Sequence, residues 1–412
     1  MFLIKCLIIG VALLASVGCN HIAATRDNPA PPQPTQISAA GIDAAEPATA
    51  AAADGTFYVA WVNHDAKQAD VMLARFNQKA QMQGSPVRVN REAGAATAWR
   101  GDQPSVAVAS DGAVYVLWTA RVDAGDKHGT DIYLSASTDR GQSFTNEVKV
   151  NDDKAPGPHG MHSLAVAKDG RIYAAWLDER NVHAPKPSSK AEGHHMESNR
   201  DLYVAYSTDG GRTFSANRKV ASDACPCCKT ALSVSADGTL YAGWRQVLPG
   251  NYRHIAVASS TDGGTKFSAP VIVSDDRWML QGCPVSGPSL TVDSASGNLK
   301  IVWFAAGEEG APGVYFAESK DKGRSFSPRQ LLSQETVRGT PALAVGNNNV
   351  IALWQSADVA ETRMRELGTA GSALSVAVNA ELPAGAFANN KLFVAYIAKE
   401  KEKRSIWLAP AN

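Results

Sequence analysis

The chain has 412 residues, with 40 Lys and Arg against 40 Asp and Glu, so its formal net charge is zero. Hydrophobic residues make up 44% and charged residues 19%, which is a globular composition and excludes a disordered chain. A neutral chain lacks the basic surplus that phosphate binding needs, so nucleic acid is not expected as a partner. The length exceeds that of one ordinary core and predicts two domains or one array of repeats.

The first residues have the pattern of an export signal. Lys5 is followed by an apolar run from Cys6 to Val17, which is typical of a secretory signal rather than of a spanning helix. The four residues Ser-Val-Gly-Cys that end at Cys19 resemble a bacterial lipobox, although Leu is usual at the position of Ser16. The resemblance implies that residues 1–18 are a lipoprotein signal peptide and that Cys19 becomes the lipidated first residue.

This leader determines where the protein is expected to act. With the lipobox in use, a lipid alone would hold the protein at the cell envelope, in the outer membrane or at its periplasmic face. Without it, the protein would be secreted. Residues 19–36 are rich in Ala and Pro and are predicted to form a flexible tether before a folded domain of residues 37–412. An exported compartment allows the remaining cysteines to be oxidised.

One sequence pattern recurs through the folded domain: an alternating strand, a turn that contains Gly or Asn, and a second strand that ends in Trp. The copies end at Trp61, Trp118, Trp176, Trp244, Trp303, Trp354 and, with Tyr in place of Trp, at Tyr396. Apolar residues alternate on both arms around a turn that tolerates positive φ, so each copy is predicted to be a β-hairpin.

A second pattern, Ser-x-Asp-x-Gly-x-x-Phe, follows four of these hairpins. Its copies are Ser137, Asp139, Gly141 and Phe144; Ser207, Asp209, Gly211 and Phe214; Ser260, Asp262, Gly264 and Phe267; and Ser319, Asp321, Gly323 and Phe326. The Asp accepts hydrogen bonds from backbone N–H groups farther along the turn, the Gly takes a φ that other residues resist, and the Phe is expected to be buried. The four Asp residues are therefore predicted to be structural rather than catalytic.

The two patterns together predict a β-propeller. Each unit would be four antiparallel strands, which cannot bury both faces alone and therefore stack radially with other units. Seven units are counted, or six if a degenerate terminal unit is not a blade. The last unit lacks a fourth strand, which residues near Gln36, Ile37 and Ser38 would supply. The expected fold is all-β, a single propeller of four-stranded antiparallel blades.

The four Ser-x-Asp-x-Gly-x-x-Phe motifs resemble the Asp-box, or BNR repeat, of bacterial sialidases and related propellers. The similarity extends over nearly the whole chain from about Ile37. It implies a sialidase-like propeller whose loop face, opposite the Asp-boxes, binds or hydrolyses acidic glycans. Many Asp-box propellers are not sialidases, so the motif is specific for the architecture, and whether the chain is a sialidase-type exo-glycosidase stays open.

The catalytic set of a sialidase consists of three Arg residues on the sugar carboxylate, a Tyr nucleophile activated by Glu, and an Asp acid. The candidates on the loop face are Arg100, Arg180, Arg245 and Arg338 for the carboxylate, Asp178 and Glu179 as acid or base, and Tyr252 as nucleophile. The sequence departs from the family, because no Arg-Ile-Pro motif occurs near the first unit and Tyr252 comes early in the chain. In the alternative interpretation, these Arg residues pair with neighbouring carboxylates.

Cysteines and histidines gather in the loops that lead into three successive units, and such loops are adjacent in a ring. The residues are His159, His162, Cys225, Cys227, Cys228 and Cys283. One interpretation is disulfides, for example Cys225–Cys283 with a vicinal Cys227–Cys228 pair, or another of the three connectivities. A second is a soft metal site for Cu or Zn. A third is a reactive thiol–disulfide centre.

Three classes of function follow from these candidates. The first is recognition or hydrolysis of a glycan, or binding of another small-molecule ligand, at the Arg- and His-lined face. The second is a metal-binding or thiol redox protein that uses the Cys and His residues. The third is a non-catalytic scaffold with a protein partner in the cell envelope. Contact with the membrane is expected through the lipid anchor only.

Overall fold

The computed structural model describes residues 33–65, 68–97, 101–124, 127–145, 147–154, 157–181, 198–307 and 310–411. Gln33–Asn412 form one compact unit, to which every strand named below belongs. These described residues form strands and turns, and no helix among them is long and apolar enough to cross a membrane.

The strands form antiparallel sheets, and most sheets have four strands. The first two are β2 (Asp43–Ala51), β3 (Phe57–Asp65), β4 (Gln68–Phe76) and β5 (Val87–Arg88), then β6 (Ser105–Val108), β7 (Val114–Ala124), β8 (Lys127–Ser137) and β9 (Val148–Lys149). An eight-stranded sheet follows with β10 (His159–Val166), β11 (Ile172–Asp178), β12 (Arg200–Ser207), β13 (Arg218–Ala224), β14 (Ala231–Val234), β15 (Leu240–Leu248), β16 (Tyr252–Ser260) and β17 (Val271–Ile272).

Three four-stranded sheets complete the unit. Two of them are β18 (Ser289–Val292), β19 (Leu299–Ala305), β20 (Gly313–Ser319) and β21 (Gln330–Gln334), then β22 (Val337–Val345), β23 (Val350–Ser356), β24 (Glu361–Glu366) and β25 (Leu374–Val378). The last sheet combines β1 (Thr35–Gln36) with β26 (Ala380–Ala388), β27 (Lys391–Glu400) and β28 (Lys403–Ala411).

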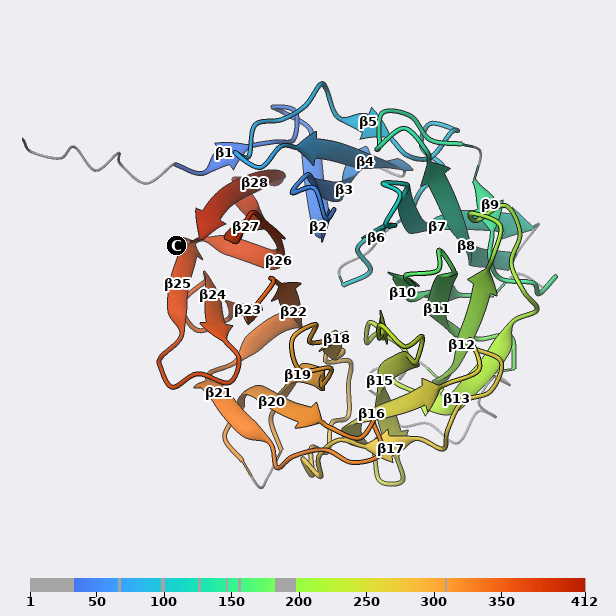
Figure 1. The fold of residues 1–412 in the computed structure, drawn as a ribbon, viewed down its shortest axis with the longest axis vertical. Helices are drawn as coiled ribbons and strands as arrows, with labels where there is room; N and C mark the ends of the chain where they lie inside the picture. Colours follow the sequence, from blue (N-terminus) through green and yellow to red (C-terminus); the bar gives the residue numbers. More distant parts are fainter. Residues whose placement is uncertain are drawn as a thin grey trace, which may run out of the picture. The chain divides into compact units, whose positions relative to one another are not determined.

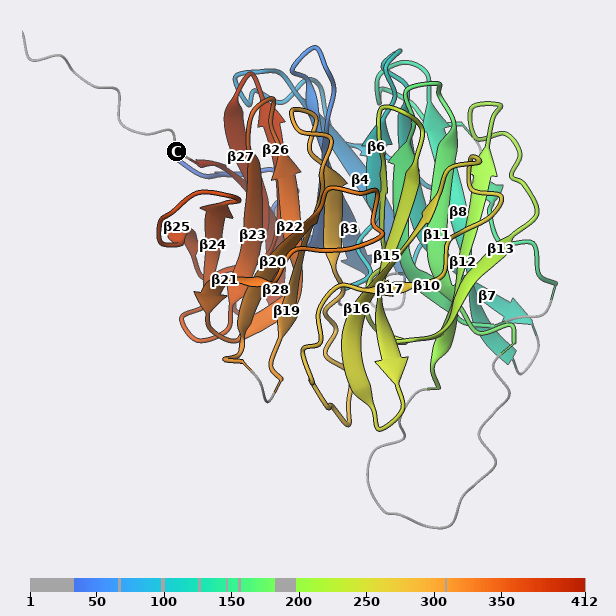
Figure 2. The ribbon, with the colours of Figure 1, turned by 60° about the horizontal axis from the view of Figure 1, so that its bottom comes forward.

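The sheets surround a common centre (Figure 1). The innermost strands contact one another in the order β2, β6, β10, β14, β18, β22 and β26, and β26 contacts β2. Seen from the side, strands of neighbouring sheets stand next to one another (Figure 2). The expected all-β propeller is confirmed. The expected number of blades stays a prediction, because the eight-stranded sheet joins β10–β13 to β14–β17 through one residue pair, Ala224 and Gln246.

The amino-terminal end of the described chain closes the last sheet. β1 pairs antiparallel with β28, where Thr35 lies opposite Leu408. The N–H of Ile37 donates to the carbonyl of Ile406 at 2.8 Å, and the Ile37 side chain is buried in the core between the first and last sheets. The fourth strand predicted for the last unit is therefore confirmed, and the folded unit begins at Gln33, inside the stretch expected to be a tether.

The Asp-boxes form the predicted turns. In the first, the Asp139 carboxylate accepts hydrogen bonds from the N–H groups of Gln142 at 3.0 Å and Ser143 at 2.9 Å, and Gly141 has a φ of +78°. Backbone N–H groups bind the carboxylates in the same way at Asp209, Asp262 and Asp321. The four Phe side chains are half-buried rather than buried, because each lies at the edge of the core against which it packs.

Six tryptophans fill the cores between neighbouring sheets, and each is at most 2% exposed. They are Trp61, Trp118, Trp176, Trp244, Trp303 and Trp354. Each indole N–H donates to a polar side chain, so none of these buried donors is left without a partner. The repeated Trp of the sequence pattern is thus the largest buried side chain of its hairpin.

Candidate functional site

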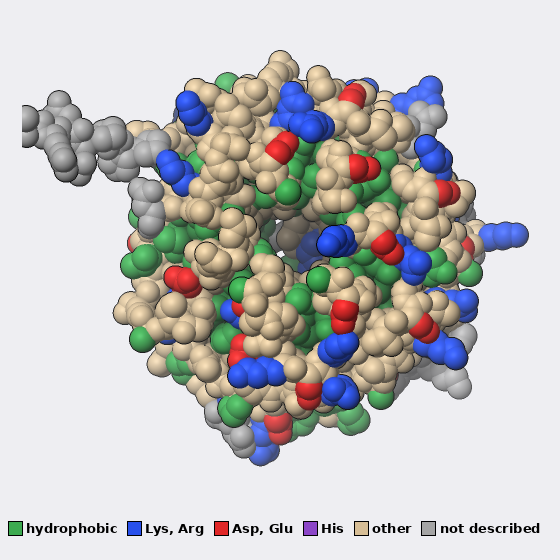
Figure 3. Space-filling model, viewed as in Figure 1, with side chains coloured by type: hydrophobic (Ala, Val, Ile, Leu, Met, Phe, Trp, Pro, Cys, Tyr) green, Lys and Arg blue, Asp and Glu red, His purple; other side chains and the backbone are tan. Residues whose placement is uncertain are grey.

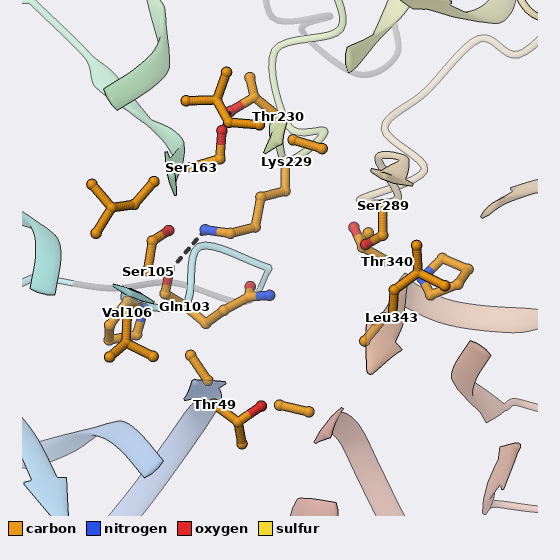
Figure 4. Close-up of a pocket in the computed structure, with 18 of the residues that line it drawn as sticks. Thr49, Gln103, Ser105, Val106, Ser163, Lys229, Thr230, Ser289, Thr340 and Leu343 are labelled. Carbon is orange, nitrogen blue, oxygen red and sulfur yellow. Dashed lines mark hydrogen bonds between the residues drawn. The ribbon is translucent and has the colours of Figure 1, made fainter. Parts of the chain in front are cut away.

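The centre of the ring is hollowed, and a cavity of about 230 Å³ opens there (Figure 3). Its walls come from the innermost strands and from the residues just before them (Figure 4). Six hydroxyl side chains line it: Thr49, Ser105, Ser163, Thr230, Ser289 and Thr340. Prolines and leucines supply apolar surface between them, and Lys229 is the one charged side chain among the described lining residues. We refer to this space as the axial cavity.

Lys229 reaches into the axial cavity from the segment before β14 (Figure 4). Its Nζ donates to the carbonyl oxygen of Gln103 at 2.8 Å and lies 3.8 Å from Oδ1 of Asp102. Burial lowers the pKa of Lys229 to about 8, and the charge of Asp102 opposes this shift. The ammonium has three N–H donors and one described hydrogen bond, so it retains donors for a ligand in the cavity.

Asp102 lies behind Lys229 and is itself fully buried. Its carboxylate accepts hydrogen bonds from the N–H of Met161 at 2.8 Å and from the hydroxyl of Thr119 at 3.3 Å. Burial raises the pKa of Asp102, while Lys229 lowers it. Burial disfavours both charges and so weakens this ion pair, but a pKa of about 8 keeps Lys229 mostly protonated at pH 7.

His162 completes this buried group. Its Nδ1 lies 3.0 Å from the hydroxyl of Ser105, and its Nε2 lies 3.9 Å from Asp102. Burial, together with the charge of Lys229, lowers the pKa of His162 well below its usual value, so the ring is neutral. The axial cavity therefore offers one cation and a set of hydroxyls, which suits an anionic, hydroxyl-bearing ligand.

The four cysteines gather in the loops just before β14 and β18. Cys227 and Cys283 form a disulfide, while Cys225 and Cys228 are buried thiols whose Sγ atoms lie 2.6 Å apart. The example pairing of Cys225 with Cys283 is therefore wrong. Cys225 and Cys227 are two residues apart in one loop, and sequence spacing does not tell which of them bonds to Cys283.

A second cluster of ionisable groups lies where β10 begins and β11 ends. The fully buried Asp178 accepts hydrogen bonds from the indole of Trp176 at 2.8 Å and from Arg180 Nε at 3.0 Å, and it lies 3.3 Å from His159 Nε2. Arg180 also binds Asp152 at 2.6 Å. These contacts are the ion pairs that the alternative interpretation of the Arg residues expected.

The same cluster contains acidic atoms that could hold a cation, because Asp131, Asp153 and His159 offer ligand atoms within 4.8 Å of one another. Protein cations already lie there: Lys149 Nζ is 2.9 Å from Asp131, and Arg180 is 3.5 Å from Asp153. His159 therefore belongs to this cluster, and His162 to the buried group behind the wall of the axial cavity. Neither imidazole joins the candidate metal-ligand set formed by Cys225, Cys227 and Cys228.

A comparison with protein families gives a match to the BNR repeat-like domain over residues 55–277, more than half of the chain. This chain belongs to the BNR repeat-like domain family. The resemblance drawn from the four Asp-boxes is thereby confirmed, while the lipobox of this BNR protein stays a prediction. No curated protein matches the sequence.

Solved structures share the fold of this BNR propeller. An ulvan lyase from a new polysaccharide lyase family is 14% identical, with a TM-score of 0.58 and coverage of 92% of this chain and 96% of that one. A Hadza microbial sialidase is 15% identical, with a TM-score of 0.51 and coverage of 86% and 76%. A Dyadobacter fermentans protein of unknown function is 13% identical, with a TM-score of 0.50 and coverage of 90% and 95%. At these identities the likeness concerns the fold alone.

The remaining predicted residues of the BNR propeller lie apart from the axial cavity. Glu179 accepts a hydrogen bond from Arg200 at 2.6 Å, and Arg245 is fully buried against the carbonyls of Ser286 and Phe304. Arg338 is exposed on β22. Tyr252 lines a separate pocket of about 570 Å³ with His254 and Arg277. Arg100 and Cys19 lie outside the described residues.

The sequence analysis missed Lys229 and Asp102. Each stands within three residues of the start of an innermost strand, Asp102 before β6 and Lys229 before β14. Lys229 follows the last cysteine and precedes the apolar strand Ala231–Val234. The position of this lysine, just before a predicted innermost strand, is the signal in the sequence that points to it.

Proposed function

We propose that the axial cavity of this BNR propeller binds one acidic sugar residue. The observation that carries the proposal is Lys229, the single cation among the described lining residues, which projects into a cavity lined with hydroxyls. An ammonium attracts the carboxylate of a sugar acid, and hydroxyl side chains both donate to and accept from sugar hydroxyls. Apolar walls such as Val106 and Leu343 suit the C–H faces of a sugar ring.

The size of the axial cavity limits the ligand. At about 230 Å³ it is smaller than the roughly 300–1,000 Å³ of pockets that enclose drug-sized molecules, so it takes about one ring rather than an oligosaccharide. A longer glycan would place its terminal acidic residue in the cavity and leave the rest of its chain outside.

Recognition is better supported than hydrolysis. A glycosidase of the usual kind needs two carboxyl groups across the scissile bond, and no Asp or Glu is among the described residues that line the axial cavity. Asp178 and Glu179, the predicted acid and base, are bound to Arg180 and Arg200. The chain therefore acts, in this proposal, as a binding module for acidic glycans.

Calorimetric titration of the full chain with glucuronate, galacturonate and N-acetylneuraminate, and with neutral glucose, tests the proposal. We expect at least one acid to bind and glucose to bind at least tenfold more weakly, because one charge-assisted contact contributes about 1.5–3 kcal/mol. The variant Lys229→Met should lose at least tenfold in affinity for the acid. Lys391→Met, at an exposed lysine on β27, is the matched control and should bind as the parent does. Equal binding of glucose, or unchanged binding by Lys229→Met, would contradict the proposal.

A further inference from the structure

The four cysteine sulfurs form a path from the surface into the core. Cys283 is exposed, and its disulfide partner Cys227 is 0% exposed. The Sγ of Cys227 lies 3.9 Å from the Sγ of Cys225, which lies 2.6 Å from the Sγ of Cys228. Each sulfur therefore has the next one within reach for thiol–disulfide exchange, and only the outer end of the path meets solvent.

Two buried guanidinium groups surround the inner end of this path. Arg245 is 0% and Arg253 is 2% exposed, and no described carboxylate forms an ion pair with either. Their hydrogen bonds go to backbone carbonyls, and Nη1 of Arg245 and both Nε and Nη1 of Arg253 have no described partner. A buried cation without an anion is costly, so a negative charge nearby is stabilised.

The sulfur of Cys225 is the group that can carry this negative charge. Burial alone raises the pKa of the Cys225 thiol, but the hydrogen bond from Cys228 and the charges of Arg245 and Arg253 outweigh burial and lower it. Burial and the neighbouring Cys225 raise the pKa of Cys228 well above its usual value. Cys225 is thus the sulfur of the pair that loses its proton more readily, and it is also the one whose Sγ lies 3.9 Å from the Sγ of Cys227.

We propose that the disulfide moves between the surface position Cys227–Cys283 and the buried position Cys225–Cys228, so that the cluster is an intrachain thiol–disulfide relay. The shift places a free dithiol either inside the propeller or at its surface. At the surface, Cys283 is the sulfur that an external disulfide would meet. This inference stands on the cysteine cluster and does not depend on sugar binding in the axial cavity.

The shift needs no external oxidant or reductant. The Cys225 thiolate attacks Sγ of Cys227; the Cys225–Cys227 bond forms, the Cys227–Cys283 bond breaks, and the electron pair leaves as the Cys283 thiolate. Cys228 then attacks Sγ of Cys225. The Cys225–Cys228 bond forms, Cys227 leaves with the electron pair, and the proton of Cys228 passes to Cys227. One thiolate, one thiol and one disulfide are present before and after.

The surface dithiol would reduce an external disulfide in two further exchanges. The Cys283 thiolate attacks one external sulfur, forms a mixed disulfide and releases the other sulfur as a thiolate. Cys227 loses its proton and attacks Cys283, the Cys227–Cys283 bond reforms, and the second external thiol departs. Two electrons pass from the cluster to the external disulfide, and the buried pair remains as Cys225–Cys228.

Mapping of the thiols in the full chain tests the relay. A phosphine is titrated until two of the four cysteines Cys225, Cys227, Cys228 and Cys283 are free thiols. The exchange is then quenched with acid, the unfolded chain is alkylated with N-ethylmaleimide, and unreduced peptides are identified by mass. We expect both a Cys225–Cys228 disulfide with alkylated Cys283 and a Cys227–Cys283 disulfide with alkylated Cys225. Detection of one of these two arrangements alone, or a stoichiometric metal ion bound to the purified chain, would overturn the relay.

Two variants identify the attacking sulfur. Cys225→Ser removes the nucleophile, so alkylation of Cys283 should fall at least tenfold relative to the parent. Cys228→Ser stops the exchange halfway, so Cys283 should be alkylated while Cys225 and Cys227 stay joined to each other. Thermal unfolding checks that each variant is folded. If either variant is not folded, the thiol mapping of the parent chain alone decides whether the relay exists. Unchanged Cys283 alkylation in a folded Cys225→Ser chain would refute the order of attack.

Discussion

His159 shows how a single residue changes its role with its surroundings. It looked like a metal ligand by spacing, but its ring lies 3.2 Å from Asp153 and 3.3 Å from Asp178. Burial alone would lower the pKa of His159, yet its bonds to Asp153 and Asp178 raise the pKa to about 10. The ring is therefore a cation that helps Arg180 balance two carboxylates.

This charge predicts a pH dependence of stability. In the unfolded chain the pKa of His159 is about 6.5, and in the folded chain it is about 10. A raised folded-state pKa means that the stabilisation is complete below pH of about 6.5 and is lost as the pH rises to about 10. Denaturant titrations across this range should show the loss, and His159→Gln should abolish it and cost about 2 kcal/mol at pH 6. A variant with the same pH profile as the parent would contradict this assignment.

At the scale of one hairpin, the Asp-box is a turn whose carboxylate replaces missing backbone hydrogen bonds. Asp139 accepts from the N–H groups of Gln142 and Ser143, while Ser137 donates to Asp139 and accepts from Gly141. Burial raises the pKa of Asp139, but the hydrogen bonds from Ser143, Ser137 and the backbone together outweigh it and lower the pKa to about 2. The repeated motif therefore stabilises the turn of the hairpin, as the sequence predicted.

The Asp139→Ala variant tests this structural role. We expect the free energy of unfolding to fall by about 1 kcal/mol at pH 7, since the freed N–H groups are exposed and bind water instead. Because the pKa of Asp139 is lower in the folded chain, its carboxylate stabilises the fold above pH of about 4, and this stabilisation is lost as the pH falls to about 2. The free energies of unfolding of the variant and the parent should therefore become equal near pH of about 2. Glu402→Ala, at an exposed turn, is the control and should change little at either pH.

At the scale of the whole molecule, the ring depends on contacts between the two ends of the described chain. β1 supplies the outer strand of the last sheet, and Ile37 enters the core shared by the first and last sheets. The loss of this segment would expose the edge of β28 and leave a gap in that core.

Removal of residues 33–38 should therefore destabilise the ring. A chain that starts at Ala39 should unfold about 3 kcal/mol more easily than one that starts at Gln33, because it loses the burial of Ile37 and three hydrogen bonds with the backbone of Ile406. Denaturant unfolding of both chains measures the difference. Equal stability would show that the ring does not need β1.

The sequence predicted more of the fold than of the site. Alternation of apolar residues around the Gly and Asn turns predicted the hairpins. The Ser-x-Asp-x-Gly motif predicted hydrogen bonds from backbone N–H groups to the Asp carboxylate, and the structure confirms them at Asp139. The grouping of Cys225, Cys227, Cys228 and Cys283 was also visible, because their loops precede adjacent strands. The choice of partner within each group was not visible, since it depends on side-chain distances of a few ångströms.

The local sequence determined the propeller, because each hairpin and its turn are formed by residues that lie a few positions apart in the chain. The tertiary structure decided the site, because its members come from different sheets. Lys229 binds the carbonyl of Gln103, 126 residues away, only because β6 and β14 flank β10 around the same centre. Asp178, predicted as an acid or base, and Arg180, predicted to bind the substrate carboxylate, are held by His159 and Asp152 from a neighbouring strand and loop. Closure of the ring brings Lys229 and Gln103 together, and no spacing in the sequence encodes it.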